Sequence, residues 1–470
     1  MNHKSEDAVI RDVWRKSHGY TPEMLYSAAQ ELDWLLEDPR YLDPNFIPPE
    51  GVQMFFGLGA NMEAEAVRMI SQGPPYEPRM ELEGSFAMSQ IQAFFPKPWV
   101  EFLKRVGMHD TIMTAEMLKE WETLLDEGIA LRNGNLLSNR PWALTDPAWT
   151  LVTPYYIARL LDPSITVPFP TNPAWIKVDD ADTLSFGITG DWGTGWYFDG
   201  EDQLCPPDAI LQQMLKLGVD YTVHLGDIYP LGATQFFDRF LKSWKPGRRG
   251  TFTLNGNHEM YAWGKGYYEV ALQHPMFAQQ QGTGYFALEF GDWIVVGLDV
   301  AYYSDPPWMY YGKVQDQAQK EFLQKVREHV ERTGQRVFML THHHVLNPEG
   351  TETNPLWDDI VADDALGKAP DYWYYGHYHS AAVYSEHSAA GPDTKVRVMG
   401  HGSIPFAVAH ELKENCGPGQ PIACYPNTHF DDDIPEHRGR VMNGFALVTL
   451  AKDGGITERF LNQDGSDMCG

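Results

Sequence analysis

Five short polar motifs follow apolar runs after residue 180. They are "GDWG" with Asp191, "GDIY" with Asp227, "GNHE" with Asn257 and His258, "THHH" with His342 to His344, and "GHYH" with His377 and His379. Carboxylate, amide and imidazole donors without a thiolate suit Mn, Fe, Zn, Ni or Co better than a closed structural zinc site. One divalent ion could not use so many donors, so the set predicts two ions that share a carboxylate. Such a pair lowers the pKa of a bridging water and holds the oxygens of an in-line displacement at phosphorus.

Each motif stands where a predicted strand ends. From about residue 180, short apolar strands alternate with helices, a pattern typical of a layered α/β sandwich. The strands are predicted over 183–191, 219–227, 250–259, 336–344 and 372–379, and helices over 206–218, 234–244 and 314–334. In open α/β folds the carboxyl ends of the strands form the ligand crevice. Glycine before four of the motifs lets the chain turn there and lets a ligand approach a metal closely.

The charge balance limits the partners. The chain of 470 residues has 36 Lys and Arg against 64 Asp and Glu, a formal net charge of -28, and its pI is near 4.9. This field opposes binding to long nucleic acid, and a small anionic substrate would need a local cation such as a metal ion. The N-terminus is too charged for a signal peptide, and no segment has the roughly 18 apolar residues of a membrane span. The sequence therefore predicts a soluble, cytoplasmic protein that does not bind a membrane.

The cysteines agree with a reducing compartment. Cys205, Cys416, Cys424 and Cys469 have no zinc-binding spacing and are too sparse for a disulfide scaffold. Cys416 and Cys424 could pair in an oxidising compartment, but we predict two free thiols.

The first third of the chain has a different pattern. Helices are predicted over 21–39 and 114–134, and the proline-rich segment 161–175 marks a boundary. We predict a mainly helical N-terminal region, 1–165, of unknown role, followed by a second domain over 180–465. The N-terminal region could be a lid, a substrate selector, an oligomer interface or a docking module for a protein partner.

The ordered set GD, GD, GNHE, HH and GHxH resembles the calcineurin-like metallophosphoesterase superfamily over roughly residues 182–405, and "GDWG" is most similar to its purple acid phosphatase-like branch. The resemblance implies a four-layer α/β/β/α sandwich with an N-terminal, mainly helical extension. It also implies a metal-dependent phosphoesterase, which we take as a phosphomonoesterase acting on a small phosphorylated substrate. A phosphodiesterase or nucleotide pyrophosphatase on the same core, or a catalytically weak binding scaffold, are the alternatives.

The resemblance also implies roles for single residues. Two divalent or mixed-valence transition metal ions, with Mn, Fe or Zn favoured, would be bridged by Asp227 and a hydroxide that attacks phosphorus in line. Asp191 and His379 would bind the first ion, while Asn257, His342 and His377 would complete the second. His258 would contact the phosphate and assist the leaving group. His343 is the alternative ligand in its run and a candidate substrate contact, as is Trp192, which could stack on the substrate.

Tyr229 departs from the pattern of that branch, in which a tyrosine three residues after the bridging aspartate binds the first metal. Here Pro230 is at the third position and Tyr229 is at the second. Because side chains alternate in an extended chain, this shift predicts that Tyr229 points away from the metal unless the loop is bulged. The first site would then have three protein ligands and no Fe(III)-tyrosinate.

Overall fold

The computed structural model describes most of the chain after residue 161 and a small part before it. The described residues are 27–34, 152, 155, 158, 159, 162–195, 205–229, 231–305, 309–403, 412, 415–426 and 442–469. Residues 27–34 of the first predicted N-terminal helix form helix and turn. The predicted helix over 114–134 lies outside the described residues, as does Pro230.

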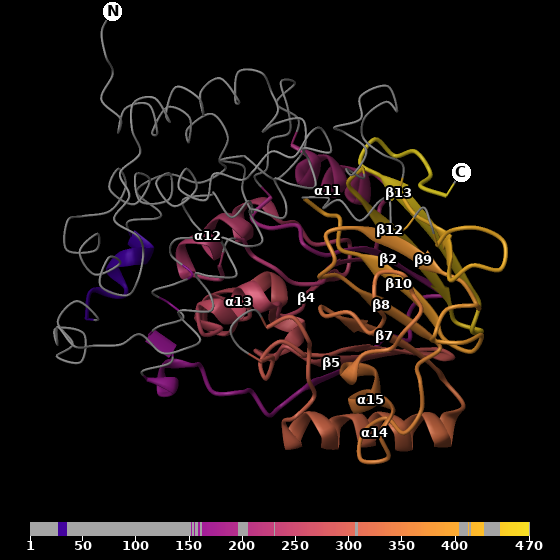
Figure 1. Ribbon diagram of the computed structural model, residues 1–470, viewed down its shortest axis with the longest axis horizontal. Helices are drawn as coiled ribbons and strands as arrows, with labels where there is room; N and C mark the ends of the chain where they lie inside the picture. The colour runs from indigo at the N-terminus through magenta and orange to yellow at the C-terminus, as the bar shows by residue number, and fades with distance from the viewer. Residues whose placement is uncertain are drawn as a thin grey trace, which may run out of the picture.

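Two β-sheets form the centre of the described structure (Figure 1). The first has the strand order β1-β5-β6-β7-β8-β10-β9-β11, with bounds Ala174–Lys177, Phe286–Phe290, Trp293–Gly297, Arg336–Thr341, Tyr372–Tyr375, Lys395–Met399, Ala381–Tyr384 and Ile422–Cys424. The second has the order β13-β12-β2-β3-β4, with bounds Ile456–Asn462, Gly444–Ala451, Thr183–Thr189, Tyr221–His224 and Gly250–Thr253. The predicted strands occur in the predicted order, but each ends two to six residues before its predicted end. Asn257, His258 and Glu259, predicted at the end of a strand, instead lie in a short helix, because the chain turns at Gly256.

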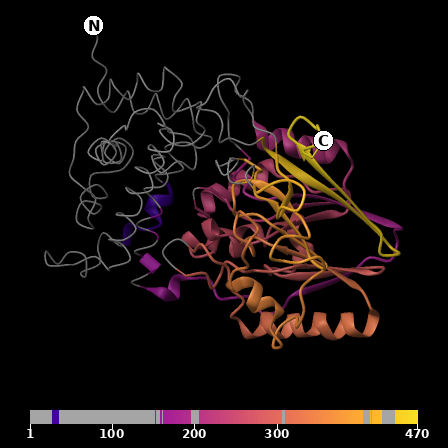
Figure 2. The same cartoon turned by 45° about the vertical axis from the view of Figure 1, so that its right-hand side comes forward.

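Helices flank the two sheets. They are α11 (Pro206–Lys216), α12 (Thr234–Ser243), α13 (Asn257–Tyr261), α14 (Gln317–Thr333) and α15 (Pro355–Val361). Figures 1 and 2 both show α14 beneath the eight-stranded sheet, and its Phe322 and Val326 pack there with Val337. Residues of α11 pack on the other sheet through Met214 and Phe445. The predicted four-layer α/β/β/α architecture is therefore confirmed.

The core between the two sheets is built from side chains of both. It includes Phe186 and Val223 of the five-stranded sheet and Phe338 and Leu340 of the eight-stranded sheet, all almost fully buried. Burial of apolar surface at about 25 cal/mol per Å² makes such a layer a main source of stability. This shared core holds the two sheets against each other. It therefore fixes the strand ends of one sheet relative to those of the other.

Parallel strands bring the predicted motifs to one edge. Strands β2, β3 and β4 are parallel neighbours, and β6, β7 and β8 are parallel neighbours in the other sheet. Their carboxyl ends therefore point the same way within each sheet. The motifs GDWG, THHH and GHYH come directly at the ends of β2, β7 and β8, whereas GDIY and GNHE begin shortly after β3 and β4.

One disulfide corrects the prediction of free thiols. Cys424, in β11, is bonded to Cys469, and the two Cα atoms are 5.6 Å apart. The sequence analysis compared Cys424 with nearby Cys416, whereas the fold returns the C-terminal segment, 45 residues further on, to the same place. Among the described residues, no helix has the length and apolar character needed to cross a bilayer.

The described N-terminal residues pack against the second domain. Glu31 accepts hydrogen bonds from Thr234 Oγ1 and Gln235 Nε2 at 2.8 Å each, at the start of α12. The Tyr155 hydroxyl donates to the Ala28 carbonyl at 3.0 Å, and its own carbonyl accepts from Trp263 Nε1 at 3.0 Å. Since Trp263 follows α13, this contact joins the N-terminal region to the helix that carries Asn257 and His258.

Candidate metal centre

Asp191 and Asp227 follow β2 and β3 in a left-handed backbone conformation, with φ of 56° and 77°. The Asp191 N–H donates to the Gly226 carbonyl at 3.0 Å, which ties the two loops together. Gly226 has a φ of 109°, and a Cβ at that position would lie 2.8 Å from His342 Nδ1. Only glycine therefore fits between the two loops at this point.

The histidines come from the other sheet. His342 follows β7, and its Nδ1 lies 2.9 Å from the Leu225 carbonyl oxygen. A carbonyl oxygen can only accept, so Nδ1 carries a proton and Nε2 of the neutral ring carries a lone pair. His377 follows β8 with a φ of 67°, and its backbone N–H donates to Asp191 Oδ2 at 2.7 Å.

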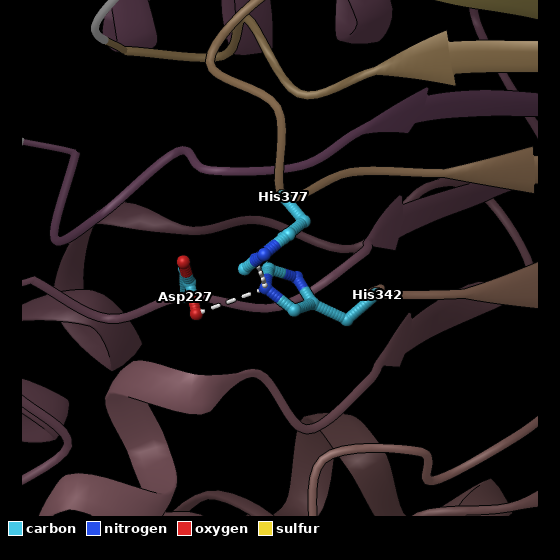
Figure 3. Close-up of side chains that lie close together, drawn as sticks. All are labelled: Asp227, His342 and His377. Atoms are coloured by element: carbon cyan, nitrogen blue, oxygen red, sulfur yellow. Dashed lines mark hydrogen bonds and ion pairs between the residues drawn. The ribbon is translucent and has the colours of Figure 1, made fainter. Parts of the chain in front are cut away.

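The candidate ligand atoms form two groups that share Asp227. One contains Asp227, His342 and His377, and the other contains Asp191, Asp227 and His379; in each, the ligand atoms lie within 4.8 Å of one another. Figure 3 shows Asp227, His342 and His377 converging from three separate loops. A shared carboxylate between two clusters is the arrangement that a bridging ligand needs.

The atoms that face one another test whether this donor set fits a cation. Asn257 Oδ1 lies 3.0 Å from His342 Nε2 and 3.1 Å from His377 Nδ1, and Asp227 Oδ1 lies 3.2 Å from the same His342 Nε2. Without a metal, the charge of Asp227 keeps a proton on His342 Nε2, and this one proton faces the oxygens of both Asp227 and Asn257. A divalent cation in place of that proton would be bound by all three residues, so they fit a metal ion with mixed oxygen and nitrogen ligands.

The carboxyl groups differ in their electrostatics. Burial raises the pKa of Asp191. Burial acts in the same direction on Asp227, but His342 and His258 outweigh it and hold the pKa of Asp227 well below its ordinary range. Asp227 in turn outweighs burial at His342 and raises the pKa of that imidazole to about 9. Asp227 is therefore the firmly ionised carboxylate of the pair, as a bridging ligand must be.

Tyr229 lies at the first cluster, which corrects the prediction that it points away. Its hydroxyl donates to Asp191 Oδ1 at 2.8 Å and is in contact with His379 Nε2. The alternation of side chains holds only in an extended chain, and the left-handed residues Gly226 and Asp227 break that geometry just before Tyr229. Burial and the charge of Asp191 raise the pKa of Tyr229 well above its ordinary value.

His258 lies beside the Asp227 carboxylate, which both clusters share. Its backbone N–H donates to Asp227 Oδ1 at 3.2 Å, and its Nε2 is 3.9 Å from Asp227 Oδ2. The ring packs edge-on against Tyr229 with the centroids 4.3 Å apart. The structure thus places His258 next to both clusters but outside either candidate ligand group.

Two predicted substrate contacts lie in the interior. Trp192 is fully buried, donates from Nε1 to the Pro207 carbonyl at 2.8 Å, and packs on Trp244 with the centroids 4.9 Å apart. His343 is also fully buried and donates from Nε2 to the Met309 carbonyl at 2.7 Å. The turn after each strand directs these rings into the core, and contact of either ring with a substrate stays a prediction.

Glu259 is a site residue that the sequence analysis did not single out. It is buried, and its carboxyl oxygens accept from the backbone N–H groups of Gly256, Asp227 and Ile228 at 2.7, 3.1 and 2.6 Å. Burial and the nearby charge of Asp227 raise its pKa to about 8. These bonds join the loop of Asp227 to the loop of Asn257. The only signal in the sequence was its position after "GNH".

Comparison with known protein families gives one match. Residues 184–381 match the family described as calcineurin-like phosphoesterase. No curated protein matches the chain.

Three solved structures are similar to parts of the chain. GAP50, the anchor in the inner membrane complex of Plasmodium, has 13% identity and a TM-score of 0.38, with 61% of this chain and 87% of that chain covered. A dimetal phosphatase from Danio rerio has 14% identity and a TM-score of 0.36, with coverages of 61% and 98%. PhoD has 11% identity and a TM-score of 0.36, with coverages of 62% and 72%.

Proposed function

We propose that the protein is a binuclear metal-dependent hydrolase that acts on small phosphoric monoesters, since residues 184–381 match the family described as calcineurin-like phosphoesterase. The observation that carries the proposal is the pair of donor clusters that share Asp227. Their residues come from four loops far apart in the chain, and all of these side chains are buried or half-buried. Such an arrangement supports a catalytic centre better than a stabilising network, because it gathers carboxylate and imidazole ligand atoms from both sheets within 4.8 Å of one another.

We assign the ligands from the contacts in each cluster. Asp191 and His379 would hold the first ion, Asp227 would bridge, and Asn257, His342 and His377 would hold the second; the Tyr229 hydroxyl stands at the first cluster as a further ligand or hydrogen-bond donor. When bound, two ions such as Mn, Fe or Zn would supply positive charge for the phosphoryl group and would lower the pKa of a bound water.

His258 and Asp227 have separate tasks in this proposal. The His258 ring, beside the Asp227 carboxylate, is placed to donate a proton or a hydrogen bond to the phosphoryl group and the departing alcohol. Asp227 keeps its negative charge between the two clusters because of the histidines around it. His342 is held in the tautomer that a ligand needs by its bond to Leu225.

The test is elemental analysis of protein purified without chelator, followed by activity with the metals that are found. We expect about two transition metal ions per chain and hydrolysis of p-nitrophenyl phosphate faster than that of its bis ester. Faster hydrolysis of the bis ester would make the protein a phosphodiesterase. Less than one ion per chain, with none gained on reconstitution, would overturn the binuclear centre. Two bound ions without turnover of either ester would indicate a binding scaffold.

The N-terminal region is proposed to be part of the same functional unit. Glu31 and Tyr155 support this, since both contact the second domain near α12 and α13. We expect a fragment that starts at residue 175 to lose activity along with these contacts. A fragment with full activity that no longer self-associates or binds a protein partner would instead favour the docking module.

A cytoplasmic location is a further proposal, and the Cys424–Cys469 bond is the observation against it, because disulfides persist mainly in oxidising compartments. Titration of thiols in protein denatured directly from its native cells tests this point. Four free thiols would support the cytoplasm, and two would place the protein in an oxidising compartment.

A further inference from the structure

Two exposed tyrosines border the second metal cluster. Tyr310 and Tyr311 are 44% and 47% exposed, the two highest values among the large apolar residues that the structure describes. The Tyr310 ring centroid lies 5.2 Å from that of His377 and 4.8 Å from that of His344. Tyr311 lies 5.5 Å from His344. Tyr310 therefore packs directly on the candidate ligand His377, and the ring of His344 lies between Tyr311 and that ligand.

The loop that carries the pair is anchored on both sides. Before it, Met309 is buried with a left-handed φ of 51°, and its carbonyl accepts the bond from His343. After it, Gly312 approaches the same histidine so closely that a Cβ would lie 2.7 Å from His343 Cβ. The Lys313 N–H then donates to the Val300 carbonyl at 2.9 Å. The exposure of the two tyrosines therefore results from a fixed turn.

The two rings favour a planar ligand group. The nearest lysine in the sequence, Lys313, is paired with Asp305 at 2.5 Å, so its charge is already matched. The two tyrosine rings lie 5.0 Å apart and almost perpendicular, at 85°. Such rings offer a face and an edge to a third aromatic ring. Single exposed apolar residues are ordinary, but adjacent ones beside a ligand cluster indicate a binding surface.

We propose that Tyr310 and Tyr311 form the subsite for the leaving group and bind a planar aromatic group of the phosphoric ester. This inference rests on the proposed function, since the phosphoryl group would lie at the metal clusters and the alcohol portion beside Tyr310. The chemical class of substrate is an ester whose alcohol carries an aromatic ring. That ring is either a benzyl or aryl group or a nucleobase.

The first experiment compares benzyl phosphate with cyclohexylmethyl phosphate. Both release a primary alkanol, so the ratio of their kcat/KM values reports recognition of the ring and not leaving-group acidity. We expect the wild type to prefer the benzyl ester. Tyr310→Ala should lower kcat/KM for that ester about tenfold and hardly change it for the other, since an aromatic contact is worth roughly one factor of ten. Tyr310→Phe should keep the preference.

A second substrate pair identifies the source of the ring. Adenosine 5′-phosphate and ribose 5-phosphate differ by the nucleobase alone. If Tyr310→Ala and Tyr311→Ala selectively reduce hydrolysis of the nucleotide, the subsite binds a nucleobase. If they selectively reduce hydrolysis of the benzyl ester, it binds an aryl or benzyl group. Either result supports the proposal.

The control is Trp175→Ala, which removes an aromatic residue of similar exposure, 38%, from strand β1. It should change neither ratio. Tyr310→Leu, which keeps apolar bulk, replaces the alanine variant if that variant does not fold. Unchanged ratios in both tyrosine variants, with turnover intact, would overturn the subsite alone. No hydrolysis of any ester by the metal-loaded wild type would instead overturn the proposed function, and the subsite with it.

Discussion

The loops of the five-stranded sheet hold their acids with backbone hydrogen bonds, whereas those of the eight-stranded sheet hold their histidines largely with packed rings. The Asp227 backbone N–H donates to Glu259 Oε2, and the Asp227 carboxylate accepts from the His258 N–H. His377 instead stacks on His344 with the centroids 5.3 Å apart and the planes 9° apart, and lies 4.7 Å from His343.

This difference follows from the charge on each ligand. A buried carboxylate needs fixed dipoles around it, because desolvation of an ion costs far more than that of a neutral group. A neutral imidazole tolerates an apolar shell and is oriented by one hydrogen bond, as at His342. Activity should therefore be sensitive to small polar changes in the loops of the five-stranded sheet, here called the acid side. In the loops of the eight-stranded sheet, here called the histidine side, it should be sensitive to changes in side-chain shape.

The largest effect is expected at the shared carboxylate. Asp227→Asn keeps the shape and removes the charge from both clusters, so kcat/KM for p-nitrophenyl phosphate should fall about a thousandfold, with loss of both ions. His377→Ala removes a ligand from one cluster and should leave one ion bound. Metal analysis and kinetics on both variants test this. Equal metal loss in Asp227→Asn and His377→Ala would contradict the expected difference between the shared carboxylate and a ligand of one cluster.

The next effect is expected at Glu259, a positioning residue that does not touch the substrate. Glu259→Gln exchanges one acceptor oxygen for an NH₂ group, and that group would face a backbone N–H that the carboxylate now binds. Activity and metal affinity should each fall about 10- to 100-fold, as for other residues that orient metal ligands. Glu331→Gln, at an exposed position of α14, is the matched control. Unchanged metal affinity in Glu259→Gln would contradict the positioning role of Glu259.

The pH dependence of stability tests the burial of His224, which lies at the end of β3 just before the loop of Asp227. His224, at the end of β3, is fully buried, and burial lowers its pKa from 6.5 to about 3. Its neutral form is favoured in the folded state, so its contribution to stability is full above pH 6.5 and is lost as the pH falls toward 3. His224→Gln should reduce the slope of unfolding free energy against pH by about 1.4 kcal/mol per pH unit between pH 6 and 4.5.

Urea unfolding at several pH values measures this slope. His387→Gln, at an exposed position, should leave it unchanged. A wild-type slope in His224→Gln would contradict the lowered pKa of His224, since it would mean that this side chain titrates alike in the folded and unfolded protein.

The smallest effect is expected on the histidine side. His344 stacks between His377 and Tyr378, with centroids 5.3 and 4.3 Å away. His344→Ala should lower kcat/KM only about fivefold, and His344→Phe should restore it, since stacking contributes about 1 kcal/mol. If the phenylalanine variant is as weak as the alanine variant, a polar role of His344 replaces the packing role.

Much of the fold was predictable because its signals are local. The strands before Asp191 and Asp227 and the helix over Gln317–Thr333 follow from apolar patterns and turn residues, and the structure confirms them. The donor types at these strand ends were also visible, because a strand that ends in "GD" or "GNH" must present its polar residue at the sheet edge. Their roles as metal ligands stay predictions.

Orientation was not predictable in the same way. Whether Tyr229 faces the cluster depends on the backbone angles of Gly226 and Asp227, and the burial of Trp192 depends on contacts with Trp244. Neither property is visible in the spacing of residues. The pairing of Cys424 with Cys469 likewise depends on where two distant segments meet.

The amino-acid sequence by itself determined which donors are present and at which strand ends they stand, since periodicity and turn chemistry act over a few residues. Only the tertiary structure decided which side chains face the clusters. It brought Tyr229 to Asp191, turned His343 into the core and left Tyr310 exposed beside His377. The physical reason is that a side chain's direction is set by backbone angles and by packing between segments that are remote in the chain.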